Sequence, residues 1–229
     1  MITIDVDEFT DLFGDNGELW IQDQWQNDDG QMCMHEGIKR CTKKRPGDFH
    51  LISQVAIAEG WGTGWNDAGG RTWDEVKAKV FDRAEIGPDR LEAVFGPQWA
   101  EIVALVRRVA VLTVDETARL EAVRPSASGP ELYMAWSSAR DATALGPARH
   151  AGSIAAMGAA LGSELPNAVG DAATALAIRD RIGQCDFTQE RYDLLTEAWA
   201  TAMGPVHPDD KRERLVRVYT SRTEYTERH

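Results

Sequence analysis

Residues 60–76 read GWGTGWNDAGGRTWDEV, and this stretch gives the strongest local prediction in the chain. Five glycines and three tryptophans place large, stiff side chains on a permissive backbone, which predicts a loop. Its end carries the capping-box pattern Thr72-x-x-Glu75. In a capping box the Thr72 hydroxyl accepts from the backbone N–H of Glu75, and the Glu75 carboxylate accepts from that of Thr72. We therefore predict a Trp/Gly loop, residues 60–71, that leads directly into a helix.

Helical signals extend in both directions from this loop. Apolar residues recur at spacings of three and four, Thr113-x-x-Glu116 is a second capping box, and no alternation is long enough to predict a sheet. Pro208, followed by two acidic residues, reads as a further helix start. The fold class that follows is all-α, a multi-helix globular protein. The predicted helices cover 5–13, 31–41, 48–59, segments starting at 72, 88, 97 and 113, and 131–145, 147–161, 167–182, 188–203 and 211–219.

Composition divides these helices into two groups. Six of the eight tryptophans lie before residue 112, whereas residues 113–204 are rich in alanine and glycine. We therefore predict a Trp-rich helical unit with an acidic N-terminal arm over 1–112, and an Ala-rich helical unit over 113–229. The linker-like stretch 125–130 is short, so the alternative is that both halves share one core.

The overall composition is that of a soluble globular protein. The chain has 229 residues, of which 43% are hydrophobic and 27% charged. It has no apolar run of the ~18–20 residues that cross a membrane, and its N-terminus lacks the pattern of a secretory signal. The odd number of cysteines (Cys33, Cys41 and Cys185) fits a reducing compartment. We expect a cytoplasmic protein that makes no use of a membrane.

Charge is distributed unevenly along the chain. The formal net charge is −12, and residues 1–38 hold ten acidic side chains with no Lys or Arg. A basic cluster follows at residues 39–45. In one interpretation the two blocks neutralise each other or simply form a solvated surface. In the other, the acidic arm recruits a basic partner or imitates nucleic acid. The basic cluster is brief and lies beside the acidic arm, so direct nucleic-acid binding is not predicted.

A group of cysteines and histidines offers a possible metal site. Cys33, His35, Cys41 and His50 form a C-x-H-x5-C-x8-H pattern, and zinc prefers thiolate and imidazole ligands. The spacing differs from that of common zinc modules, so the alternative is a small buried thiol at Cys33. A Cys–His nucleophile is a further reading, but the surrounding acidic residues would raise the pKa of the thiol.

The Trp/Gly loop is the candidate binding surface. Its residues Trp61, Trp65, Asn66, Asp67 and Arg71 could contact a partner, although asparagine and aspartate also shape turns and clustered tryptophans also close small cores. The chain lacks a Walker loop, a dinucleotide-binding glycine motif, H-E-x-x-H and G-x-S-x-G. The sequence therefore predicts no catalytic residue and no required cofactor, and favours a binding protein over an enzyme.

One resemblance adds to this reading. Trp20, Cys33 and Gly37, followed by Trp-Asn-Asp at 65–67, Gly-Arg-Thr at 70–72 and Glu-Val at 75–76, are similar to the pattern of an uncharacterised helical family. That family is found in actinobacteria and their bacteriophages, and the similarity covers roughly residues 5–85. The resemblance implies a helical fold and a phage-associated source, and it implies no activity.

These observations combine into one expected function with two alternatives. We expect a phage-encoded cytoplasmic protein that acts by binding a host or phage protein, in a host-interaction or regulatory role. The first alternative is a metal-binding protein or enzyme centred on Cys33, His35, Cys41 and His50. The second is an acidic mimic of nucleic acid.

Overall fold

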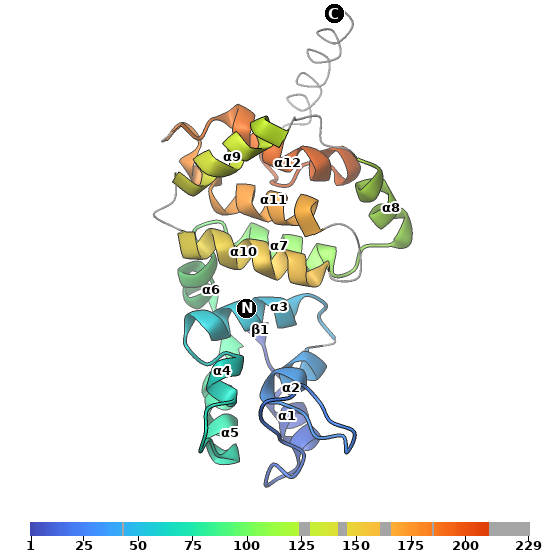
Figure 1. The fold of residues 1–229 in the computed structure, drawn as a ribbon, viewed down its shortest axis with the longest axis vertical. Helices are drawn as coiled ribbons and strands as arrows, with labels where there is room; N and C mark the ends of the chain where they lie inside the picture. Colours follow the sequence, from blue (N-terminus) through green and yellow to red (C-terminus); the bar gives the residue numbers. More distant parts are fainter. Residues whose placement is uncertain (43, 124–128, 142–145, 161–165, 185, 211–229) are drawn as a thin grey trace, which may run out of the picture. The chain divides into compact units, whose positions relative to one another are not determined.

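A computed structural model of the chain describes residues 1–42, 44–123, 129–141, 146–160, 166–184 and 186–210. Most of these residues lie in the helices α1–α12, which confirms the all-α fold class (Figure 1). In the described residues no helix has both the length and the apolar character needed to span a membrane. The internal contacts divide the chain into two compact units, Met1–Val94 and Phe95–His229.

The N-terminal unit combines short helices with one small strand pair. Ile2 pairs with Ile86 and Thr3 with Glu85 in an antiparallel ladder. Strands of two residues are too short to show alternation, so the sequence did not predict them. The elements of this unit are β1 (Ile2–Thr3), α1 (Val6–Phe13), α2 (Met34–Cys41), α3 (Asp48–Ala58), α4 (Thr63–Asn66), α5 (Trp73–Asp82), β2 (Glu85–Ile86) and α6 (Pro88–Phe95).

The aromatic core of this unit is centred on Trp73, the first residue of α5. Its ring centroid lies 4.9 Å from that of Phe13 and 5.9 Å from that of Phe9, and the two phenylalanine rings are 4.8 Å apart. Phe9 and Phe13 are fully buried on α1. The Thr72–Glu75 capping box is present as predicted, so it fixes the start of α5 at the place where Trp73 enters the core.

Two glycines let the chain approach these rings closely. Gly17 has φ +73°, and a Cβ there would lie 2.3 Å from Cγ of Trp73. Gly37, on α2, has a helical conformation, but a Cβ there would lie 2.3 Å from Cε2 of Phe13. Any larger side chain at Gly37 would therefore push α2 away from α1.

We predict that Gly37→Ala destabilises the protein by about 1–3 kcal/mol, because overpacking a well-filled core forces backbone and rotamer shifts. Chemical denaturation monitored by circular dichroism measures this change. Gly64→Ala is the matched control, since Gly64 lies in the short helix α4 and nothing is within 4 Å of a Cβ placed there. Equal stability of the two variants would contradict the packing argument.

The C-terminal unit contains the longer helices. The structure places the helix that begins after Pro97 here, although the composition had grouped it with the residues before 113. Its buried face (Ile102, Leu105 and Val106) packs against α10 and α11, and alanine content does not reveal that partnership. The elements are α7 (Trp99–Val109), α8 (Val114–Ala122), α9 (Gly129–Asp141), α10 (Gly146–Ala159), α11 (Pro166–Ala177), the 3₁₀ turn η1 (Arg179–Arg181) and α12 (Gln189–Met203).

Small residues bring these helices together in layers. Helix α11 packs on α10 and α7 on one side and on α12 on the other, and α9 and α8 pack against α12 (Figure 1). A Cβ on Gly170 of α11 would lie 3.1 Å from Oγ of Ser153 on α10. Ala155 and Ala156 of α10 are buried, which agrees with the close approach that their spacing predicted.

The predicted helices match those observed to within a few residues at most ends. Both capping boxes are formed, including the one at Thr113 and Glu116 that begins α8. The short helix α4, inside the Trp/Gly loop, was not predicted. The predicted helix 211–219 and most of the linker-like stretch 125–130 lie outside the described residues.

Asp171 on α11 makes the stability of the protein depend on pH. Burial raises the pKa of its carboxyl from 3.8 to about 7, and a hydrogen bond from Trp136 only partly opposes this. The native state then binds the proton more tightly than the unfolded state, so stability falls as the pH rises from about 4 to about 7.

We predict that Asp171→Asn removes this loss while keeping an acceptor for Trp136. The variant should be more stable than the wild type at pH 8, by on the order of 2–4 kcal/mol, and about equal to it at pH 4. Thermal unfolding across this pH range tests the prediction. A difference that stayed constant with pH would show that folding does not raise the pKa of Asp171.

Candidate functional site

The Trp/Gly loop is hydrogen-bonded to an acidic segment that lies far from it in the sequence. We call residues 20–32 the acidic loop, because they contain the exposed Asp23, Asp28 and Asp29. Trp20 Nε1 donates to Oδ1 of Asn66 at 3.0 Å, and Gln22 Nε2 donates to the carbonyl oxygen of Asn66 at 2.7 Å. These bonds join residues 44 to 46 positions apart.

Asn66 is the centre of this connection. It is 1% exposed, its Oδ1 accepts from Trp20, and its Nδ2 donates to Oδ1 of Asp67 at 2.7 Å. The same Asp67 oxygen accepts the backbone N–H of Asp23 at 3.0 Å. A buried amide that lost these partners would carry the cost of an unsatisfied polar group, so Asn66 and Asp67 fix the position of the acidic loop.

Backbone hydrogen bonds close the acidic loop on itself. Ile21 N–H donates to the Met32 carbonyl at 3.1 Å, and Cys33 N–H donates to the Trp25 carbonyl at 3.0 Å. Asp23 has φ +63°, in the left-handed region that aspartate tolerates better than most residues. Its carboxylate and those of Asp28 and Asp29 are exposed, so the loop presents them to solvent from a fixed backbone.

Trp25 is the residue of this loop that sequence reasoning missed. Its side chain is 54% exposed, and its ring lies edge-on to that of the buried His35, with centroids 6.4 Å apart. The available signal was a single tryptophan within the polar run Gln24 to Asn27, where no helix or strand pattern needs an apolar side chain. An indole held on an acidic loop can contact both apolar and cationic groups.

The structure distributes the five predicted loop residues between interior and surface. Trp61 is 1% exposed and its indole donates to Glu59 at 3.0 Å, so Trp61, like Asn66, serves the interior. Trp65 and Arg71 are half-buried, with the guanidinium 4.0 Å from the ring centroid of Trp65. Arg71 also forms an ion pair with Glu75 at 3.3 Å. Trp65, Asp67 and Arg71 are the three that a partner could reach.

Most carboxylates of the acidic arm have no cation beside them among the described residues. Glu8 pairs with Lys44 at 3.5 Å, and Glu36 pairs with Lys39 and Arg40 at 3.3 and 3.2 Å. The basic cluster thus neutralises only part of the arm. The arm's exposed acidic residues, for which the described residues provide no ion pair, are Asp5, Asp7, Asp11, Asp15, Glu18, Asp23, Asp28 and Asp29.

The cysteines and histidines of the alternative metal site have separate roles in the described residues. Cys33 caps α2, because its Sγ accepts from Glu36 N–H at 3.5 Å. Burial lowers the pKa of His35 to about 4, and its buried Nδ1 has no hydrogen-bond partner within the described part of the chain. Burial also raises the pKa of Cys41 to about 12, which keeps the thiol neutral, and lowers the pKa of His50. Within the described residues no three His, Cys, Asp or Glu side chains gather in a metal-binding arrangement.

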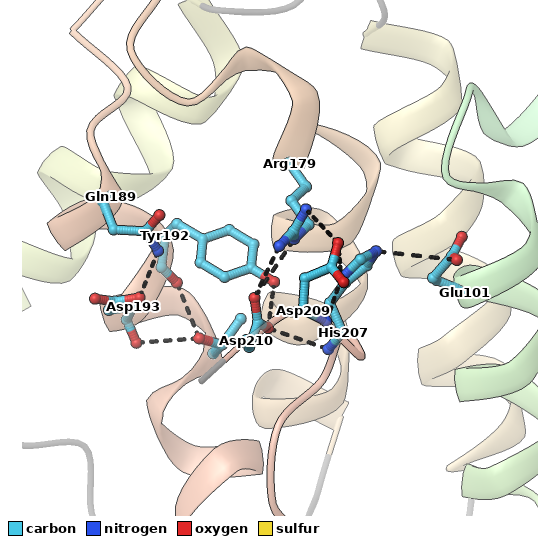
Figure 2. Close-up of polar contacts among 9 residues, drawn as sticks. Glu101, Arg179, Gln189, Tyr192, Asp193, His207, Asp209 and Asp210 are labelled. Carbon is cyan, nitrogen blue, oxygen red and sulfur yellow. Dashed lines mark hydrogen bonds and ion pairs between the residues drawn. The ribbon is translucent and has the colours of Figure 1, made fainter. Parts of the chain in front are cut away.

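A second polar group lies in the C-terminal unit, around Asp210 (Figure 2). Its carboxylate accepts from the Tyr192 hydroxyl at 2.8 Å and the His207 backbone N–H at 3.1 Å, and pairs with Arg179 at 3.3 Å. Burial and the neighbouring Asp210 charge raise the pKa of Tyr192, so its hydroxyl keeps the proton that it donates. Pro208 and Asp209 form a turn in a segment bound to α12 and η1, and the helix predicted to follow it lies outside the described residues.

The ring of His207 is fixed by the same segment. Its Nδ1 accepts from Asp209 N–H at 3.1 Å, so the neutral ring carries its proton on Nε2. This nitrogen lies 3.9 Å from Oε1 of Glu101 on α7 (Figure 2). Beside these residues α7, α8, α12 and residues 205–208 line a pocket of about 510 Å³. The described residues that line the pocket include no Ser, Thr, Cys or Lys side chain.

Comparison of the chain with protein-family models, curated proteins and solved structures gives no match.

We predict that Asn66→Ala destabilises the N-terminal unit by about 1–3 kcal/mol, because Trp20 and Asp67 each lose a buried partner. Denaturant unfolding monitored by tryptophan fluorescence measures the loss. Asn16→Ala is the control, since Asn16 is exposed and its side chain donates to the exposed Glu18 at 3.0 Å. An Asn66 variant as stable as the Asn16 variant would refute the role of the buried amide.

Proposed function

We propose that this protein acts by binding another protein, and that the acidic loop of its N-terminal unit contacts a basic segment of that partner. The observation that carries the proposal is an exposed indole, Trp25, on a fixed backbone beside the exposed carboxylates of Asp23, Asp28 and Asp29, for which the described residues provide no ion pair. Trp65, Asp67 and Arg71, next to the loop's attachment, extend the predicted contact surface.

The chemistry of this loop matches a lysine- or arginine-rich partner. The carboxylates attract the lysine and arginine side chains of such a partner over several ångströms. One of these side chains can also lie over the face of Trp25 in a cation–π contact. Tryptophan is also enriched among the residues that dominate binding energies at protein interfaces. Because hydrogen bonds to Asn66 and Asp67 already order the loop, binding does not have to offset the cost of ordering it.

The resemblance to a family of actinobacteria and their phages indicates where such a partner belongs. We propose a phage-encoded protein in the host cytoplasm and a host or phage protein as its target. The alternative function for the same surface is mimicry of nucleic acid, in which the acidic loop occupies the nucleic-acid site of a DNA- or RNA-binding protein. The identity of the captured partner, and its competition with nucleic acid, distinguish these two.

The test starts with affinity capture from actinobacterial lysate, followed by measurement of Kd for the captured protein with purified components. We expect Trp25→Ala to weaken binding at least tenfold, by loss of the central indole. We expect the triple variant Asp23→Asn, Asp28→Asn, Asp29→Asn to weaken it and to flatten its dependence on salt concentration, because fewer charges face the partner.

Matched controls separate this surface from general charge and hydrophobicity. The triple variant Glu92→Gln, Glu121→Gln, Glu190→Gln removes three exposed acidic charges elsewhere, and Phe81→Ala removes another exposed aromatic ring. Both should leave Kd within about twofold of the wild type, as expected for surface changes away from an interface. Weakening by the controls equal to that by the acidic-loop variants would refute the proposal.

A further inference from the structure

The pocket of the C-terminal unit has the size of a small-molecule site and a lining that is part polar and part apolar. Its volume of about 510 Å³ falls within the range of roughly 300–1,000 Å³ that ligand pockets occupy. Leu105 of α7, Trp199 and Met203 of α12, and Val206 supply an apolar lining. Leu105 and Trp199 are each 5% exposed, so both belong to the packed wall.

One side of this pocket carries an excess of positive charge. Glu116 accepts from the backbone N–H and the hydroxyl of Thr113, at 3.0 Å each, and from Arg108. These bonds lower the pKa of Glu116 to about 2, so its carboxylate is ionised at neutral pH, and it forms an ion pair with Arg108. Arg119 lies 3.8 Å from the same carboxylate, its side chain is 59% exposed, and it lines the pocket.

The other side of the pocket carries a negative charge. Glu101 lines it and faces Nε2 of His207 at 3.9 Å. Glu101 and Arg108 are seven residues apart on α7, which corresponds to about 10 Å along the helix axis. An anionic ligand group is therefore repelled at Glu101 and attracted at Arg119, which orients a ligand that has one charged end.

We propose that this pocket binds a small apolar carboxylate, with its carboxylate at Arg119 and its apolar body over Leu105, Trp199 and Met203. Two sources share this chemistry: a free carboxylic acid and the C-terminal carboxylate of a peptide. The proposal concerns the C-terminal unit and does not rest on protein binding by the acidic loop.

Calorimetric titration of the full-length protein tests the proposal with octanoate and, as the charge-reversed probe, octylammonium. We expect octanoate to bind and octylammonium to bind at least tenfold more weakly. Arg119→Gln should weaken octanoate binding about tenfold, because it removes a charge-assisted hydrogen bond. Glu116→Gln should tighten it several-fold, since Arg108 and Arg119 would both turn to the ligand and a glutamine still completes the capping box.

Two further variants control for folding and for the location of binding. Ala104→Trp places an indole in the pocket from an exposed position on α7, and should abolish binding with little change in Tm. Arg181→Gln removes an arginine outside the pocket lining and should leave Kd unchanged. Equal binding of octanoate and octylammonium, or octanoate binding that persists in Ala104→Trp, would overturn the proposal.

A peptide arm separates the two sources of the carboxylate. The probes are N-acetyl-Ala-Phe-Leu as the free acid and as the C-terminal amide. If the peptide free acid binds more tightly than octanoate and the peptide amide does not bind, the site is assigned to a peptide C-terminus. Octanoate binding without peptide binding assigns it to a free acid. Absence of binding by both acids contradicts the proposal.

Discussion

The buried amide of Asn66 is the constraint on which the N-terminal unit depends. It joins the indole of Trp20 to the carboxylate of Asp67, and through them it holds the acidic loop against α4. Exposed acidic segments otherwise repel themselves and gain little from burial. Because this loop is bonded at defined backbone and side-chain atoms, its charges and Trp25 occupy fixed positions, which is what a binding surface requires.

The C-terminal unit is held by different physics. Close packing of small residues, with Gly170 of α11 against Ser153 of α10, brings its helices together. The segment that follows α12 is held by its own Asp210, whose carboxylate contacts Tyr192 and Arg179. This segment supplies Val206 to the wall of the pocket. The two proposed binding surfaces thus have separate structural causes, so a substitution in one should leave the other intact.

Local signals predicted the fold class and the helix starts, but not the long-range contacts around the candidate sites. The capping boxes at Thr72 and Thr113 were readable because their partners lie three residues away, and the helical class follows from apolar spacing. The bonds of Asn66 to Trp20 and of Asp210 to Arg179 span 46 and 31 residues, and no local pattern indicates such pairs. The exposure of Trp25 was not predicted, because a segment without helix or strand periodicity does not show which side chains face solvent.

Amide hydrogen exchange of the acidic loop, measured by NMR on the wild-type protein, tests the central claim most directly. The backbone N–H of Asp23 donates to Asp67, and those of Ile21 and Cys33 donate within the loop's own backbone network. If the loop is fixed as described, these three amides exchange far more slowly than the solvent-facing amides of the same loop. Exchange of all three at the rate of an unstructured peptide would contradict the account, because the acidic loop would then have no fixed surface.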